Sequence, residues 1–561
     1  MTADPKERAE MFSRFFSSVF TRSEDDAPFI EVDPEIPLIE DVYISEERIL
    51  KIIDELKEGT AAGPDGLATK VIKMLKTELV RPFSILFRRS IEAKEIPDDW
   101  RKAHITAIYK GKGKRSDPGN YRGVSLTCVV GKILERIVKA DMAEHIEKNN
   151  LFNKSQHGFR TGRSCQTNLV EFMDQMTKWL DEGKSFDIIY LDFAKAFDKV
   201  CHRRLIVKLR RLGIAGNLLK WIENWLSGRI QRVVLEGEYS EWVQVLSSVL
   251  QGSVLGAILF NVFINDVDKA TLYALLWKFA DDTKMAMVVE DEEDAKKMQA
   301  DLDNLNRWAK EWRMCFNASK CKVMHIGNGN REYDYHMDGV VLEKVTKEKD
   351  LGVWMHQSMK PATQCEAAAK KANMTLGRIL RSFHYRKSSY LVPLYKSFVR
   401  PQLEYSVAAW SPWMQKDIDV LEKVQKRLVR SMSDKKGDDH ETRLKNVGLT
   451  TLEERRRRGD QIQAFKAIKG ISRVNHNEWF SMKDPTTMRP TRSNTTVTET
   501  GETTKSHVMN IPACRLDIRK NSYSVRIGSE WNGLPESLKN AKSTNEFKNL
   551  YDRHVTEKTQ T

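Results

Sequence analysis

Two adjacent aspartates lie between two strand-like runs in KFADDTKMAMVV, residues 278–289. The apolar residues on either side are typical of two strands joined by a tight turn, with Asp281 and Asp282 at its tip. Two carboxylates at one tip repel each other unless a cation joins them. Aspartate in a turn is more often simple turn chemistry, so the pattern indicates a cation site only together with a partner elsewhere.

A second apolar run supplies such a partner. FDIIYLDF, residues 186–193, reads as a buried strand that ends at Asp192, and we expect a helix to begin near Lys195. Carboxylates on two neighbouring strands can hold two Mg2+ ions, which prefer oxygen ligands. Such ions serve in-line phosphoryl transfer by activating a hydroxyl and neutralising the leaving group. Taken alone, Asp192 is explained equally well as a strand-end cap.

Between these acids lies SSVLQGSVLGAILFNVFIND, residues 247–266, which predicts a glycine-containing turn followed by a long apolar helix. Gly252 and Gly256 would let the backbone approach a base or ribose closely. The same residues are also explained as the beginning of an ordinary helix.

Lysine and arginine outnumber aspartate and glutamate by 92 to 78, for a formal charge of +14. A polyanionic partner explains this excess, and so does the solvated surface of a large protein. The seven cysteines form no close CxxC pair, and we interpret them as reduced thiols of an intracellular protein. The charged N-terminus and the short apolar run at 253–264 predict no membrane anchor.

The pattern along the chain is α+β. Helices are expected over 1–60 as an N-terminal extension, and strands alternate with helices up to about 360. A helical region follows at 357–480, in which DIDVLEKVQKRLVR has one apolar and one basic face. The Thr-rich residues 486–505 predict a flexible linker within 481–519, and 520–561 form a small C-terminal region.

Three motifs in this order and spacing resemble the palm motifs of reverse transcriptases. They are D..KAFD at 192–198, LQGSVLG at 250–256 and FADD at 279–282. The similarity is closest to enzymes of non-LTR retrotransposons of the jockey and CR1-like kind. AAGPDG at 61–66, QHGFRTGRSC at 156–165 and RPQLEYSVAAWSP at 400–412 also look like that family, and the resemblance covers roughly residues 10–555.

The resemblance implies an RNA-directed DNA polymerase with a right-hand fold of fingers, palm and helical thumb. The reverse transcriptase domain would span 91–356, with fingers from about residue 40, a palm with an antiparallel sheet, and a thumb at 357–480. The implied partners are an RNA template, a DNA primer and deoxynucleoside triphosphates. Target-primed synthesis would place the protein in the nucleus, with the cytoplasm as the alternative.

The same resemblance assigns roles to single residues. Asp192 and Asp281 would bind two Mg2+ ions, or Mn2+ in their place, together with the backbone carbonyl of Phe193. Asp282 would complete the acidic cluster. Phe197 falls where the family has an aromatic gate under the sugar, which would favour deoxynucleotides.

The remaining assignments concern phosphates and nucleic acid. Lys110 and Arg122 match positions that grip the triphosphate, and Gln251 and Gly252 would shape the floor beneath it. Lys320 or Lys322 would lie near the departing pyrophosphate as a proton donor, although a salt bridge explains either lysine as well. The expected nucleic-acid contacts are Lys112, Lys114, Lys423, Lys426, Arg427 and Arg430.

The sequence also departs from the family. Ser248, Leu250 and Ala257 replace a glycine and two prolines in the family's GVPQGSVLGP, and Cys201 stands where proline is common. We expect the loop to be less rigid without its prolines. The endonuclease domain that precedes the polymerase in relatives is not recognised, so the primer nick would come from elsewhere.

Two alternatives stay open. The chain could be a folded but catalytically silent nucleic-acid-binding remnant of such an element. It could also be an RNA-dependent RNA polymerase, although an aromatic gate at Phe197 disfavours that reading. The run Arg455 to Arg458 could grip RNA in either case, and a solvated helix face explains it better.

Overall fold

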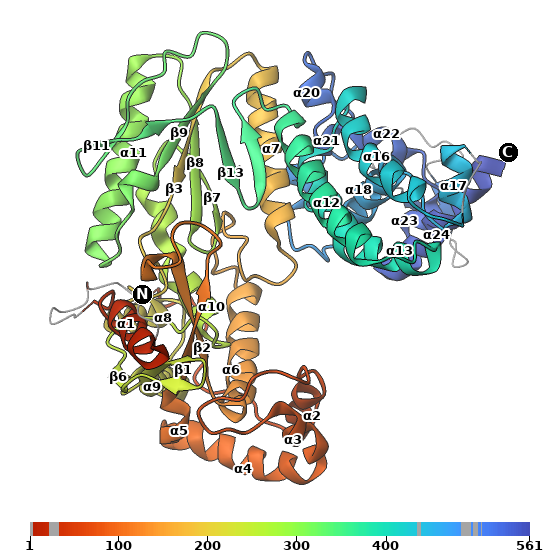
Figure 1. Cartoon of the computed structure of the whole chain (residues 1–561). Coiled ribbons are helices and arrows are strands. Elements are labelled where there is room, and N and C mark those ends of the chain that lie inside the picture. The colour runs from red at the N-terminus through yellow and green to blue at the C-terminus, as the bar shows by residue number, and fades with distance from the viewer. Residues whose placement is uncertain are drawn as a thin grey trace.

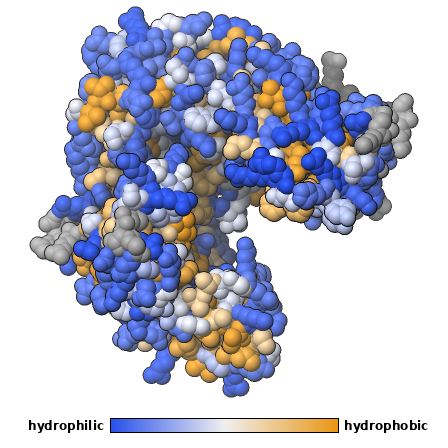
Figure 2. All heavy atoms as spheres, viewed as in Figure 1, coloured by the Kyte–Doolittle hydropathy of each residue, from blue (hydrophilic) through white to orange (hydrophobic). Residues whose placement is uncertain are grey.

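The computed structural model of the protein (Figure 1) describes residues 4–21, 28, 33–434, 439–483, 495–497, 503–505 and 508–560. Its class is α+β, which confirms the prediction. An N-terminal lobe, a central sheet with its helices and a helical region are arranged around a hollow that is visible in Figure 2. Among the described residues, no helix has both the length and the apolar character needed to cross a membrane.

A five-stranded sheet organises the N-terminal lobe, with strand order β2-β1-β4-β5 and β6 paired to β4. Strand β1 runs antiparallel to β2 and parallel to β4. The strands are β1 (Lys102–Tyr109), β2 (Tyr121–Leu126), β4 (Ile230–Leu235), β5 (Glu238–Tyr239) and β6 (Val243–Gln244). The helices around it are α1 (Pro5–Ser17), α2 (Glu46–Asp54), α3 (Thr69–Met74), α4 (Lys76–Ala93), α5 (Asp98–Arg101), α6 (Val129–Lys148) and α9 (Gly216–Leu226).

The central sheet has the order β12-β9-β3-β8-β7. Its neighbours pair antiparallel, except for the parallel pair of β12 with β9. The strands are β3 (Phe186–Leu191), β7 (Leu275–Phe279), β8 (Asp282–Val288), β9 (Lys322–Ile326) and β12 (Glu343–Lys344). Nearby lie α7 (Cys165–Asp181), α8 (His202–Arg211), α10 (Gly256–Phe263), α11 (Glu292–Glu311) and the short pairs β10 (His336–Met337) with β11 (Val340–Val341) and β13 (Lys347–Asp350) with β14 (Val353–His356).

Strand β3 is buried on both faces, which explains why consecutive residues at its centre are apolar. Ile188 belongs to the core shared with Phe172 of α7, and Ile189 belongs to the core shared with Leu302 of α11. Helices α7 and α11 lie on opposite sides of the sheet in Figure 1. The central strand therefore delivers Asp192 from the middle of the protein to the edge of the hollow.

The helical region has one hydrophobic core. Leu376 and Leu421 share it with Trp531, Phe547 and Tyr551, so the C-terminal residues pack into the same core as residues 357–480. Its longer helices are α12 (Ala362–Ser382), α16 (Gln415–Arg430), α18 (Leu452–Ile468) and α24 (Thr544–Gln560). The shorter ones are α13 (Ser388–Leu394), α14 (Arg400–Glu404), α15 (Val407–Trp410), α17 (His440–Asn446), α19 (His476–Trp479), α20 (Asp517–Lys520), α21 (Tyr523–Arg526), α22 (Gly528–Asn532) and α23 (Glu536–Lys539).

Within the predicted linker, β15 (Thr495–Val497) pairs antiparallel with β16 (Thr503–Lys505). The other residues of the Thr-rich stretch 486–505 lie outside the described residues.

Candidate active site

The turn that carries the paired acids is held by a distant segment. Only Ala280 and Asp281 connect β7 to β8, and Ala280 has a left-handed φ of +55°. The side-chain oxygen of Gln156 accepts hydrogen bonds from the backbone N–H groups of Ala280, at 2.9 Å, and Gly158, at 2.8 Å. A Cβ on Gly158 would lie 2.3 Å from the Ala280 nitrogen, so only glycine fits there. The QHG segment therefore fixes the turn.

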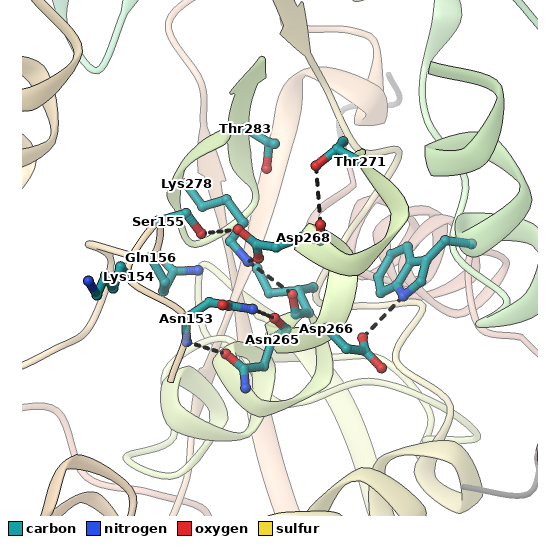
Figure 3. Close-up of polar contacts among 12 residues, drawn as sticks. Asn153, Lys154, Ser155, Gln156, Asn265, Asp266, Asp268, Thr271, Lys278 and Thr283 are labelled. Carbon is teal, nitrogen blue, oxygen red and sulfur yellow. Dashed lines mark hydrogen bonds and ion pairs between the residues drawn. The ribbon is translucent and has the colours of Figure 1, made fainter. Parts of the chain in front are cut away.

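A buried ion pair anchors the same hairpin one step further back (Figure 3). Lys278 of β7 is fully buried and pairs with Asp268, which also accepts a hydrogen bond from the Ser155 hydroxyl. The backbone N–H of Asn153 donates to the Asn265 side chain at 2.9 Å. Burial lowers the pKa of Lys278, and the neighbouring Asp268 carboxylate opposes this change. These contacts tie the strand end to the loop that carries Gln156.

Asp192 lies beside this hairpin because β3 and β8 are neighbours, with Leu191 opposite Thr283. The Asp192 carbonyl accepts a hydrogen bond from the Asn317 N–H at 2.7 Å. The helix expected from Lys195 is wrong: residues 194–199 form turns, and α8 begins at His202. Lys195 has a left-handed φ of +55°, which no helix accommodates.

A cavity of about 370 Å³ gathers most of the predicted site. Its lining includes Lys110, Arg122, Asp192, Phe193, Phe197, Gln251 and Asp281. It also includes residues that had no predicted role in nucleotide binding, namely Phe16, Phe20, Lys195 and Asp198. Lys195 and Asp198 lie within the D..KAFD motif, whereas Phe16 and Phe20 come from the N-terminal segment, which no motif links to the site.

The two candidate lysines of the 320–322 segment separate clearly. Lys320 lines the cavity, with its Nζ 3.5 Å from the Asp192 Oδ2. Lys322 pairs with Glu343 instead. Lys320 is thus the lysine of the first cavity, where it pairs with Asp192, whereas Lys322 lines a neighbouring cavity together with Asp282.

Charges of both signs perturb each other around the cavity. Burial lowers the pKa of Lys110, and the like charges of Lys195, Arg122 and Lys320 lower it further. Burial raises the pKa of Asp281, and Asp192 adds to the rise. Cations that crowd one another beside crowded carboxylates are arranged to receive both a polyanion and a divalent cation.

Asp282 faces a second, smaller cavity of about 130 Å³. Asp192 and Lys320 line both cavities, so they lie at the boundary between them. Desolvation and the carboxylates of Asp281, Asp350 and Asp192 together raise the pKa of Asp282 to about 6. Behind it, the buried Lys284 of β8 pairs with Asp350 and donates to Asn168 at 2.9 Å. This ion pair joins the hairpin to β13.

The donor set fits a magnesium ion that takes part of its ligands from a substrate. In the part of the chain that the structure describes, no three His, Cys, Asp or Glu side chains gather tightly enough to enclose a metal. Asp192 and Asp281 nevertheless line one cavity, and the charge of one raises the pKa of the other. Mg2+ commonly uses one or two carboxylates and completes its shell with water and phosphate oxygens.

The Gln251–Gly252 turn is held against β2 by a hydrogen bond and a close backbone approach. The Ser125 N–H donates to the Gln251 carbonyl at 2.7 Å, and a Cβ on Gly252 would lie 2.4 Å from the Ser125 oxygen. The buried Glu135 accepts from the Val254 N–H at 2.7 Å, just before α10. The predicted long helix is shorter than expected, because α10 ends at Phe263 and a 3-10 helix follows.

Ser248 carries strain. Its φ is +114°, in the region that favours glycine, which is the residue the family has at this position. Its carbonyl accepts a hydrogen bond from the His202 ring at 2.9 Å.

Phe197 is held by other rings. It stacks on Phe260 with centroids 4.2 Å apart and an interplanar angle of 15°. Phe159 meets it edge-on at 6.3 Å. The orientation of the Phe197 ring is thus fixed by packing.

The predicted basic contacts differ in their exposure and in their partners. Lys112, Lys114, Lys423 and Arg430 are exposed, whereas Arg427 donates to the Asn373 side chain at 3.1 Å and Lys426 is half-buried. In the arginine run, Arg455 pairs with Glu404, Arg457 with Glu453 and Arg458 with Asp552, and Arg456 is buried. Each arginine of this run is therefore paired with a carboxylate or buried.

Residues 109–377 match the family model of reverse transcriptase (RNA-dependent DNA polymerase). This segment contains every candidate residue around the first cavity except Phe16 and Phe20, and it is a reverse transcriptase domain.

The domain is related to polymerases of non-LTR retrotransposons. The chain is 24% identical over 406 residues to the probable RNA-directed DNA polymerase from transposon BS of Drosophila melanogaster, covering 69% of this chain and 44% of that protein. It is 25% identical over 402 residues to the RNA-directed DNA polymerase from mobile element jockey of Drosophila funebris, covering 69% and 43%. The match spans less than half the length of these relatives.

Proposed function

We propose that the protein is an RNA-directed DNA polymerase that adds deoxynucleotides to a primer 3′-hydroxyl with two Mg2+ ions, for which Mn2+ can substitute. One observation carries the proposal. The carboxylates of Asp192 and Asp281 line the same cavity as a group of cations, Lys110, Arg122, Lys195 and Lys320. Carboxylates suit divalent cations, and clustered cations suit a triphosphate.

Each group then has a task. Bound metal ions would supply activation of the attacking hydroxyl and neutralisation of the leaving pyrophosphate. Asp192 and Asp281 would hold those ions, the Phe193 carbonyl would offer a further oxygen, and Asp282 would complete the negative charge. Lys110 and Arg122 bind the phosphates. The turn at Gln251 and Gly252 forms the floor beneath the nucleotide.

Phe197 selects the sugar, because a ring fixed against Phe260 leaves no room for a 2′-hydroxyl. Replacing Phe197 by Val should raise the use of ribonucleotides relative to deoxynucleotides by about tenfold or more. Single-nucleotide incorporation measures this ratio. An unchanged ratio would contradict the gate and reopen the reading as an RNA polymerase.

The nucleic acid would follow the hollow between the lobes. In a right-hand polymerase the N-terminal sheet corresponds to the fingers, the central sheet to the palm and the helical region to the thumb. Lys370, Lys371, Arg378 and Arg381 of α12 are exposed. Figure 2 shows strongly hydrophilic side chains over this part of the helical region. With Lys112 and Lys114 they would contact the phosphates of an RNA template and DNA primer.

Primer extension on an RNA template, run beside Asp281→Asn and Asp192→Asn, tests the proposal. Each variant should lose extension by about a thousandfold or more, because an amide removes the charge that holds the cation. Hybrid affinity should stay within about twofold of the parent value. Substantial synthesis by either variant would refute the assignment.

The catalytically silent remnant is favoured by one specific observation, the strained φ of Ser248 where the family has glycine. A parent protein that binds the hybrid but extends no primer would support this second reading.

A further inference from the structure

Helix α1 is held to the N-terminal lobe near its start and to the cavity region just after its end. Near its start, Arg8 pairs with Glu236 at 2.7 Å. Just after its end, the Thr21 N–H donates to the Ser247 hydroxyl at 2.9 Å. That hydroxyl in turn donates to the Asp198 carbonyl at 2.7 Å. The N-terminal segment is therefore connected to the turn that follows Asp192.

The apolar face of α1 lies on the N-terminal sheet next to a phosphate-binding candidate. Phe16 is buried in a core with Ile105 and Val233. Its ring lies 3.5 Å from the place that a Cβ on Gly123 would take, directly beside Arg122. The missing side chain at Gly123 lets the ring approach the backbone of β2.

Two further rings of this segment reach the site itself. Phe20 and Phe16 line the first cavity together with Asp192 and Asp281. Phe15 lies under Lys195, with the Nζ 4.7 Å from the ring centroid, which is cation–π distance. The segment thus contributes aromatic surface to a cavity whose other walls are largely charged or polar.

We propose that residues 5–21 form the apolar wall of the nucleotide cavity. Phe16 and Phe20 pack against the nucleoside part of the incoming deoxynucleoside triphosphate, while Phe15 positions the Lys195 ammonium for its phosphates. This proposal rests on the function proposed above. It assigns nucleotide binding to a helix that lies more than ninety residues before the matched family domain.

Phe20→Ala is the informative variant, because Phe20 is only half-buried and its loss leaves the core intact. Arg8→Ala is the matched control, since it removes a contact of the same helix far from the cavity. Both are made in the full chain. The affinity for Mg·dNTP is measured by equilibrium binding to the complex with a chain-terminated primer on RNA, and KM and kcat are measured in extension.

Phe20→Ala should weaken dNTP binding and raise KM by about fivefold to tenfold, with kcat and hybrid affinity within about twofold. Phe15→Ala should also raise KM through Lys195, and Phe15→Tyr, which keeps the ring, should restore it. Arg8→Ala should match the parent.

Normal dNTP affinity in a folded Phe20→Ala protein would overturn the wall while leaving the polymerase proposal intact. A parent that binds dNTP but does not extend would refute the polymerase alone, and a parent that binds no dNTP would refute both.

Discussion

The cations around the first cavity and the arginines of α18 differ in how they are paired with carboxylates. Around the cavity, positive groups crowd one another, and burial and like charges lower the pKa of Lys110. On α18, Arg455 and Arg458 each pair with a carboxylate from another helix. The contrast teaches that a dense basic run in a sequence does not identify a binding site. A binding site is indicated instead by cations that face a cavity and have too few carboxylates to pair with.

Backbone geometry shows the same contrast. Lys195, Ser248 and Ala280, all close to the cavity, have left-handed φ values although none is glycine. The residues of α18 have none. Strain of this kind costs about 1–3 kcal/mol for each residue and collects at functional sites.

The largest expected effect comes from removing two cavity cations together. Lys110→Ala combined with Arg122→Ala should lower kcat/KM for dNTP by about a thousandfold, because each charge-assisted contact contributes roughly 2 kcal/mol. Steady-state extension measures it. The matched control, Arg455→Ala with Arg458→Ala, should stay within about twofold. Comparable losses in both double variants would contradict a special role for the cavity cations.

A paired arginine should instead affect stability. Arg526 pairs with the buried Asp460 at 2.9 Å and also donates to the Ala408 carbonyl at 2.8 Å. Arg526→Met leaves the carboxylate buried without its partner and should lower the free energy of unfolding by about 3 kcal/mol. Urea denaturation checks this, and extension at low temperature should be normal. Arg457→Ala, at an exposed pair, should cost less than about 0.5 kcal/mol.

Relief of the backbone strain at Ser248 should stabilise the protein. Ser248→Gly removes the Cβ from a residue with φ of +114° and should raise stability by about 1 kcal/mol. Thermal unfolding measures the gain. Ala464→Gly in the regular helix α18 should do the reverse, by about 1 kcal/mol or more. A destabilised Ser248→Gly protein would show that the loop stores no strain.

The smallest expected effect concerns the contribution of His157 to the stability of the folded protein at acidic pH. Burial lowers the pKa of His157 from its ordinary value of 6.5, while Glu171 opposes the change. The folded protein thus resists protonation that the unfolded chain accepts, so stability is retained above pH 6.5 and falls below it. His157→Gln should flatten this fall by less than about 1 kcal/mol between pH 7.5 and 5.5. Equal slopes of Tm against pH would exclude His157 as the cause.

Local periodicity was enough to predict the strands that carry Asp192 and the paired acids. Strand β3 and the β7–β8 hairpin are predicted from runs of about six residues, because apolar residues mark their buried faces. The turn at Lys195 could not be predicted, because a left-handed φ at lysine has no sequence signal and depends on the surrounding contacts.

Hydrogen-bond partners that lie far apart in the chain could not be predicted from the sequence for a different reason. Gln156 supports Ala280, and Glu135 supports Val254, across more than a hundred residues. Gln156 lies in a loop and Glu135 lies in a helix, and nothing in the neighbouring sequence of either residue indicates its distant partner. Only the fold shows which backbone group each side chain supports. The position of the α1 aromatic rings at the cavity depends on where the helix docks, which local sequence does not show.

The bond from Thr21 to Ser247 has a consequence for synthesis of the chain on the ribosome. It spans 226 residues, and the cavity also needs Asn317 and Lys320. At 5–20 residues per second, roughly 15–60 seconds separate the emergence of α1 from completion of the cavity. During that interval the rings of α1 lack their partners, and the nascent protein has no complete nucleotide site.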